Sequence, residues 1–135
     1  MATFQLDIVT PEKTVYSGNV NSLQAPGVDG GFGVLSRHQP MLAALAIGQV
    51  AFVETGGHSR KLAMSGGFAN VSRDGVIVLA ETAELTEEID VNRARASRDR
   101  AQARLARKGD ADVDVERARA SLMRAMWRLR VAGVE

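Results

Sequence analysis

Residues 76–95 read VIVLAETAELTEEIDVNRAR, and the pattern of residue types changes within them. Residues 76–80 are apolar and mostly β-branched, which predicts a strand over residues 76–83. After Thr86 the chain is dominated by Ala, Arg and Leu, and no Gly or Pro occurs between Asp90 and Lys108, which favours a helix. The sequence therefore divides near residue 86 into a part built of strands and a part built of helices.

Upstream of this junction, short apolar stretches are separated by turn residues. Phe4, Leu6 and Ile8 alternate with polar residues, as in a strand with one buried face. Turns are expected at residues 55–58 and 73–75, where Gly, Asp and His accumulate. Strands are expected at residues 3–9, 19–25, 49–54, 59–65, 68–72 and 76–83. Strands this close together predict an antiparallel β-sandwich, or flattened barrel, over residues 1–86.

Downstream, residues 87–135 are expected to form an antiparallel helical hairpin. Asp90 is suited to cap the first helix, and Lys108 followed by Gly109 is typical of its end. The second helix is expected to begin near residue 112 or 114 and to run to about Val131. Its apolar stripe consists of Val115, Ala118, Leu122, Ala125 and Leu129. Because the facing stripes are rich in Ala, we expect the hairpin to be marginally stable.

The net charge of +1 conceals an uneven distribution. Residues 1–88 hold 5 Lys/Arg and 9 Asp/Glu, whereas residues 89–135 hold 12 and 7. A basic tail predicts contact with an acidic surface. The absence of cysteine excludes disulfides and thiolate chemistry, and a reducing compartment is the simplest expectation. No signal or membrane-spanning segment is expected, so membrane association would go through a partner.

The sequence contains no arrangement of residues typical of catalysis or metal binding. His38 and His58 are the two histidines and lack metal-ligand or triad spacing, and there is no phosphate-binding loop. The glycines of residues 27–33 are expected to allow a tight bend. Two alternatives stay open: an enzyme that uses the acidic cluster at residues 81–88, otherwise interpreted as a solvated linker, and a small nucleic-acid-binding β-domain. Trp127 is the sole aromatic residue in the basic tail, which disfavours the latter.

A series of short motifs follows one another along essentially the whole chain. They are Thr10-Pro11-Glu12-Lys13, Val15-Tyr16-Ser17-Gly18, Pro26-Gly27, Gly30-Gly31-Phe32-Gly33-Val34-Leu35, His38-Gln39-Pro40, Ser65-Gly66-Gly67-Phe68, Val76-Ile77-Val78-Leu79-Ala80 and Ile89-Asp90-Val91-Asn92-Arg93-Ala94. In this order they resemble the epsilon subunits of bacterial and chloroplast ATP synthases. The resemblance implies a non-catalytic central-stalk subunit that couples proton-driven rotation to ATP synthesis at the cytoplasmic face of the bacterial inner membrane.

The resemblance also implies which residues meet other subunits. Contacts with the gamma subunit or the ring of c subunits are expected for Gly31, Phe32, His38 and Met41. Two positions depart from the family pattern, because members often carry an acidic residue in place of Gly31 and Pro-Gly in place of Ser36-Arg37.

A regulatory role for the hairpin follows from the same resemblance. The hairpin is expected to be permissive when folded and to restrain ATP hydrolysis when extended along gamma, with Arg117, Arg124 and Arg128 meeting the alpha and beta subunits. Some members of the family bind nucleotide through the segment that corresponds to Asp90 and Arg93, which implies weak regulatory ATP binding at most. No other cofactor, no metal and no nucleic acid is expected.

Overall fold

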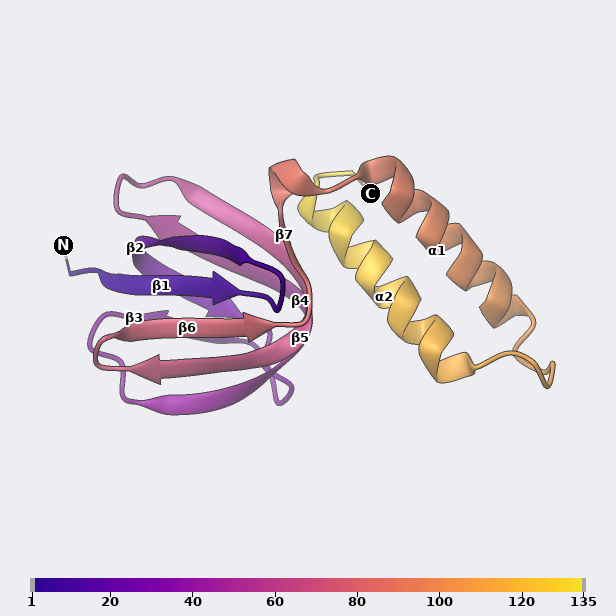
Figure 1. Ribbon diagram of the computed structural model, residues 1–135, viewed down its shortest axis with the longest axis horizontal. Coiled ribbons are helices and arrows are strands. Elements are labelled where there is room, and N and C mark those ends of the chain that lie inside the picture. Colours follow the sequence, from indigo (N-terminus) through magenta and orange to yellow (C-terminus); the bar gives the residue numbers. More distant parts are fainter. Residues whose placement is uncertain (1, 135) are drawn as a thin grey trace.

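The computed structural model describes residues 2–134 and consists of a strand-built body followed by two helices (Figure 1). The helices lie beside one end of the strands. In chain order the elements are β1 (Phe4–Val9), β2 (Thr14–Ala25), β3 (Phe32–Leu35), β4 (Met41–Glu54), β5 (Ser59–Ser72), β6 (Gly75–Ala80), β7 (Ala83–Leu85), the 3-10 turn η1 (Thr86–Glu88), α1 (Val91–Ala106) and α2 (Val115–Val131). The predicted order, strands followed by a helical hairpin, is confirmed.

The strands form one hydrogen-bonded sheet that folds over and closes on itself. Neighbours follow the order β1-β6-β5-β4-β2-β3, β7 pairs with β5, and β1 also pairs with β2. This last pairing joins strands that are otherwise distant in the order, so the sheet becomes a flattened barrel, as predicted. All pairs are antiparallel except β1 with β6, which the sequence pattern did not indicate.

The longest strands, β4 and β5, pair with each other along nearly their whole length. Their ladder is interrupted once, where Ala46 and Gly66 fall outside the register. On one side of this break β5 pairs with β6, and on the other side it pairs with β7. Both strands therefore pass from one layer of the barrel into the other at the same point.

Gly67, next to this break, is required by the close approach of β6. Its φ is 152°, and a Cβ at this position would lie 1.9 Å from the carbonyl oxygen of Leu79. No side chain fits at such a distance, since even ordinary carbon–oxygen contacts exceed 3 Å. Glycine at position 67 thus allows β5 and β6 to pair immediately after the bend.

The bend expected from the glycines of residues 27–33 is confirmed at two of them. Gly30 has a φ of 128°, and a Cβ on Gly27 would lie 2.5 Å from the carbonyl oxygen of Gly30. Residues 32–35, however, form β3, which pairs with the end of β2 and was not expected. Gly33 weakens the intrinsic preference for a strand, and pairing with β2 overrides that preference.

Four further strand boundaries differ from those expected. β2 begins at Thr14 instead of residue 19. β4 begins at Met41 instead of residue 49, β5 is continuous where two strands were expected, and residues 76–83 are divided between β6 and β7. Residues 41–47 read MLAALAI, a run rich in Leu and Ala that carries no alternation. Pairing with β5 makes this run a strand, because strand formation depends more on neighbouring strands than on intrinsic preference.

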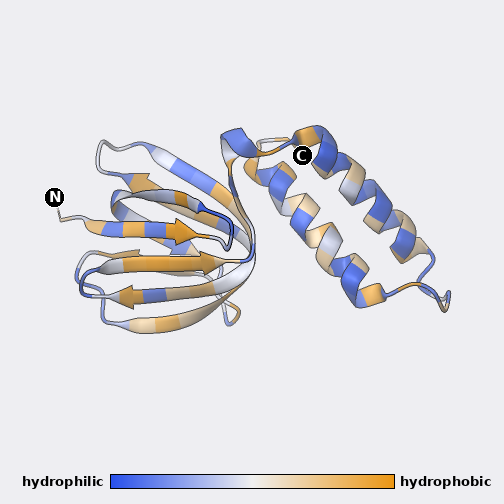
Figure 2. Ribbon diagram, in the orientation of Figure 1, coloured by the Kyte–Doolittle hydropathy of each residue, from blue (hydrophilic) through white to orange (hydrophobic). Residues whose placement is uncertain are grey.

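The hydrophobic core lies between the two layers of the barrel. Its largest fully buried side chains are Phe52, Leu6, Ile8, Leu23, Leu62, Val20, Val50, Val76 and Val78. Figure 2 shows apolar and polar residues alternating along β1, whereas β6 is apolar along most of its length. Every member of the core cluster within the described residues lies between positions 6 and 85, so the barrel has its own core without the helices.

The first helix has the cap that its sequence predicts, and the second begins at the later of its two expected starts. The Asp90 carboxylate accepts the backbone N–H of Arg93 (3.1 Å), and the Asp114 carboxylate accepts that of Arg117 (3.1 Å). α2 ends just before Gly133, whose φ is 84°. α1 ends at residue 106, slightly before the expected Lys108–Gly109 boundary.

The helices face each other mainly through small side chains. Ala94 and Ala101 of α1 are buried, as are Ala118, Ala125 and Leu129 of α2. Ala118, Ala125 and Leu129 were assigned to the apolar stripe of the second helix from the sequence, and that assignment is confirmed. A buried methyl group contributes only ~0.8 kcal/mol, so little apolar area holds the pair together.

The hairpin covers the outer surface of the barrel at β5 and β4, where α2 packs against both strands. Leu62, Ala63 and Met64 are all buried although they are consecutive on β5, so both faces of the strand are covered here. Leu62 and Met64 belong to the core, whereas Ala63 lies near Arg124 and Arg128 of α2. Neither helix within the described residues is long and apolar enough to cross a membrane.

A chain that ends after Glu88 is expected to fold. It keeps every residue of the core cluster and loses the packing of α2 against β4 and β5 together with the Arg128–Glu84 ion pair, so its unfolding free energy should fall by only about 1–3 kcal/mol relative to the full chain. Urea unfolding followed by circular dichroism measures this difference. An insoluble product, or one that unfolds without a cooperative transition, would show that the barrel depends on the hairpin.

Candidate interaction surfaces

The layer formed by β1, β6, β5 and β4 carries apolar side chains on its outer surface. In register across the strands, one row consists of Val9, Leu79, Phe68 and Ala44, and the next consists of Asp7, Ile77, Asn70 and Leu42. Phe68 is 53% exposed and Leu42 is 71% exposed. We call these two rows the outer apolar face.

This face departs from the usual pattern of an antiparallel sheet, in which apolar residues point inward and polar residues point to water. In β6, Val76 and Val78 point into the core, while Ile77 and Leu79 point outward and are about half exposed. Contiguous exposed apolar surface of this kind marks an interaction site. The sequence signal was the unbroken apolar run at residues 76–80, which we interpreted only as a strand.

The structure separates the four residues expected to contact gamma or the c ring. Gly31 lies before β3 on the loop that contains the glycine bend, whereas His38 follows the other end of β3. Phe32 and Met41 are partly buried and pack against the core. The four residues therefore do not form one surface patch, and their contacts with other subunits stay predictions.

The linker between barrel and hairpin is held by two ion pairs. Glu87 accepts from Arg60 of β5 (2.7 Å), and Glu88 accepts from Lys13, in the turn between β1 and β2 (2.9 Å). We call these two pairs the linker clamp. The segment is exposed, as expected of a solvated linker. Glu87 and Glu88 are both paired with cations, which gives no support to the alternative of an enzyme that uses the acidic cluster at residues 81–88.

Arg60 is itself positioned by the barrel. Its guanidinium lies 3.5 Å from the Glu54 carboxylate and 5.9 Å from the ring centre of Tyr16. The Tyr16 hydroxyl donates to Glu54 (2.9 Å). Burial, together with the hydrogen bond to Glu54, raises the pKa of Tyr16 to about 12, so the hydroxyl remains a donor at neutral pH. Arg60 thus presents a fixed cation to Glu87.

A further ion pair joins α2 directly to the barrel. Arg128 donates to Glu84 of β7, and the Thr86 hydroxyl lies 3.4 Å from the carbonyl oxygen of Val131. Of the three arginines assigned to a regulatory tail, Arg128 and Arg124 therefore face the barrel, while Arg117 is exposed at the start of α2. Their role toward other subunits stays a prediction.

Asp90 and Arg93, the residues of the nucleotide hypothesis, line a cavity of about 540 Å³ between barrel and hairpin. Lys13 and Arg128 also line it, but both are ion-paired with glutamates. The carboxylates around the cavity are Glu12, Glu81, Glu84, Glu88 and Asp90. Because carboxylates outnumber cations, the cavity is poorly suited to a triphosphate.

Both parts of the chain match known family descriptions. Residues 3–86 match the beta-sandwich domain of the ATP synthase delta/epsilon chain, and residues 87–133 match the long alpha-helix domain of that chain. An ATP synthase epsilon chain of Anaeromyxobacter sp. (strain K) is 48% identical over 128 residues, which span 95% of this chain and 96% of the relative. Another, of Desulforamulus reducens, is 48% identical over 107 residues, spanning 79% and 80%.

A solved structure shares the fold. A chain of the mitochondrial ATP synthase assembly of Euglena gracilis superimposes with a TM-score of 0.82, at 24% identity over 98% of this chain and 82% of that chain. A flattened barrel with an appended helical hairpin is thus an architecture already known in a rotary ATP synthase.

The chain belongs to the ATP synthase delta/epsilon chain family. The prediction of an epsilon subunit, a component of ATP synthase without catalysis of its own, is confirmed by these relatives. They give no support to the nucleic-acid-binding alternative.

Replacing Glu88 by Gln should reduce the dependence of stability on acidic pH. The hydrogen bond from Lys13, followed by that from the Leu85 backbone N–H, holds the pKa of Glu88 below its ordinary value of 4.5. A carboxyl whose folded pKa is lowered stabilises the fold above its unfolded pKa, and this contribution is lost as the pH falls through the folded pKa.

The measurement is the unfolding free energy in urea at pH 7 and at pH 3. Because the Lys13–Glu88 pair is largely exposed, the variant should lose no more than about 1 kcal/mol at pH 7, and its loss on acidification should be smaller than that of the wild type. Glu12→Gln, in the neighbouring turn, is the control. Identical acid sensitivity in wild type and Glu88→Gln would contradict the clamp.

Proposed function

We propose that the chain is a rotor subunit of the central stalk, and that its outer apolar face is the surface that binds the gamma subunit. The observation that supports this surface most strongly is the group of exposed apolar side chains on three neighbouring strands, namely Leu42, Phe68, Ile77 and Leu79. Such a face is unfavourable in water and is stabilised when a partner covers it. On this proposal the subunit lies at the cytoplasmic face of the bacterial inner membrane and contacts the c ring through barrel loops.

Coupling requires a subunit that transmits torque without deforming. The closed barrel meets this requirement, because its long β4–β5 ladder is shared by both layers and its core is independent of the hairpin. A densely packed interior has low compressibility and transmits strain. The barrel can therefore join gamma to the ring as one rigid body.

For the hairpin we propose a regulatory role, permissive in the folded arrangement and inhibitory when extended. Its alanine-rich interface and the largely exposed ion pairs that hold its linker contribute little free energy each. A small free-energy gap between two arrangements lets binding to another surface shift the population. Arg117, Arg124 and Arg128 would then meet acidic residues of the alpha and beta subunits.

Replacing Phe68 by Ser should weaken binding to gamma about tenfold or more, since a half-exposed aromatic side chain in the middle of an apolar face is typical of an interface hot spot. Calorimetry with purified gamma subunit measures the affinity. Val28→Ser removes an equally exposed apolar side chain from the loop before β3 and should leave the affinity unchanged.

Unchanged affinity in Phe68→Ser would reject the outer apolar face as the gamma site. The assignment to the complex is tested separately by purification of the native enzyme. The chain should co-purify with alpha, beta and gamma subunits, and its recovery solely as a free protein would reject the rotor role.

We propose that ATP binds at Asp90 and Arg93 weakly at most. Arg93 is the one cation of the cavity that has no ion pair among the described residues, so a single cation is available to the phosphates. Titration calorimetry at millimolar ATP should give a small heat that Arg93→Ala abolishes. Arg104→Ala, at the far end of α1, is the matched control. If the wild type gives no heat, Asp90 is a helix cap and nothing more.

A further inference from the structure

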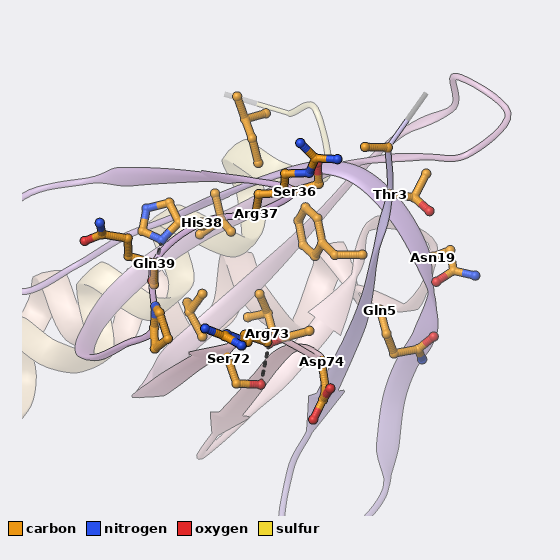
Figure 3. Close-up of a pocket in the computed structure, with 18 residues that line it drawn as sticks. Thr3, Gln5, Asn19, Ser36, Arg37, His38, Gln39, Ser72, Arg73 and Asp74 are labelled. Carbon is orange, nitrogen blue, oxygen red and sulfur yellow. Dashed lines mark hydrogen bonds between the residues drawn. The ribbon is translucent and has the colours of Figure 1, made fainter.

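A second cavity, of about 700 Å³, is lined by the start of β1, the segment that joins β3 to β4 and the turn that joins β5 to β6. These segments lie at the end of the barrel away from the hairpin (Figure 1). Figure 3 shows the cavity between the segment that joins β3 to β4 and the turn that joins β5 to β6. Arg37 and His38 lie on one side, and Arg73 and Asp74 lie on the other. Its apolar lining includes Phe4, Val34, Val71 and Val76.

This cavity is continuous with the outer apolar face. The strand register places Gln5 opposite Gly75 and Gly75 opposite Ser72, which is the row that follows Asp7, Ile77 and Asn70. Gln5, Ser72 and Gly75 all line the cavity. Two residues along a strand span about 7 Å. A partner bound to the outer apolar face can therefore place a neighbouring side chain in the cavity.

The charged groups around the cavity are predominantly basic. Within residues 2–134, neither the Arg37 nor the Arg73 guanidinium pairs with a carboxylate. Asp74 is the single acidic residue in the lining, and His38 uses its Nδ1 to donate to the carbonyl oxygen of Gln39 (2.8 Å). Two guanidinium groups are thus available to an incoming anion.

Arg37 also has an unusual backbone conformation. Its φ of 65° is the one positive value at a residue other than glycine within the described part of the chain. Left-handed backbone is uncommon for a long side chain and concentrates at binding sites, where the surrounding structure enforces it. A hydrogen bond from the His38 N–H to the carbonyl oxygen of Leu35 (3.2 Å) closes the four-residue turn that contains Arg37.

From these observations we propose that the cavity receives an acidic side chain of the gamma subunit, whose carboxylate is held between Arg37 and Arg73. The apolar lining suits the aliphatic stem of a glutamate, and guanidinium groups form strong, directional hydrogen bonds with carboxylates. This inference rests on the proposed binding of gamma to the outer apolar face. The cavity adds a charged anchor that fixes the orientation of gamma on that face.

The experiment compares the affinity of the full chain for purified gamma at low salt (about 50 mM) and at high salt (about 500 mM), where charges farther apart than a few ångströms are screened. The variants are Arg37→Gln, Arg73→Gln and the double variant. Arg104→Gln removes one charge from an exposed position of α1 and is the control. Thermal unfolding of each variant verifies that it is folded.

Each single substitution should weaken binding at low salt, and the double variant should lose about tenfold or more, with a smaller dependence on salt than the wild type. Arg104→Gln should behave as the wild type. Folded arginine variants that bind as the wild type at both salt concentrations, while Phe68→Ser loses binding, would overturn the anchor and leave the gamma-binding face in place.

Two other outcomes are also decisive. If Phe68→Ser and the arginine variants all bind as the wild type, both the anchor and the proposed gamma surface fail. If the arginine variants retain gamma but lose isolated c ring, the carboxylate belongs to the ring, and the anchor as proposed is wrong.

Discussion

The shared bend of β4 and β5 is the constraint on which the rest of the structure depends. These strands pair along nearly their whole length and leave the register together at Ala46 and Gly66. One pair of strands therefore contributes to both layers, and β6 and β7 are added on opposite sides of the break. Gly67 allows this arrangement because no Cβ fits against the carbonyl oxygen of Leu79. The closed barrel, its core and its outer rows all follow from this geometry.

The hairpin is attached to the barrel by ion pairs as well as by the packing of α2 against β4 and β5. Its helices face each other through alanines, and its linker is fixed by glutamates that reach cations of separate elements. Exposed ion pairs contribute up to about 1 kcal/mol each and weaken with salt. The barrel has a self-contained core, whereas the hairpin position is set by several small terms. Such a division suits a rigid body that carries a movable part.

The opposite side of the barrel has a different character. Apolar rows cover the outside of β6, β5 and β4, and a basic cavity continues them at the end of the sheet. The hairpin and the segments that line this cavity lie at opposite ends of the barrel (Figure 1), so contact with a partner at the cavity does not obstruct the hairpin. The two halves of the proposed function, coupling and regulation, are thereby separated in space.

The sequence by itself determined the order of strands and helices, the cap at Asp90 and the alanine-rich stripe of the second helix, because these depend on local periodicity and on side chains that bond neighbouring backbone. It also carried the family resemblance. The tertiary structure alone decided that MLAALAI is a strand, that residues 32–35 pair with β2, and that Glu87 and Glu88 are clamped. It likewise separated Gly31 from His38 and placed Arg37 and Arg73 on opposite sides of one cavity. Each of these features depends on residues distant in sequence, and pairing between strands outweighs the preferences that a local pattern expresses.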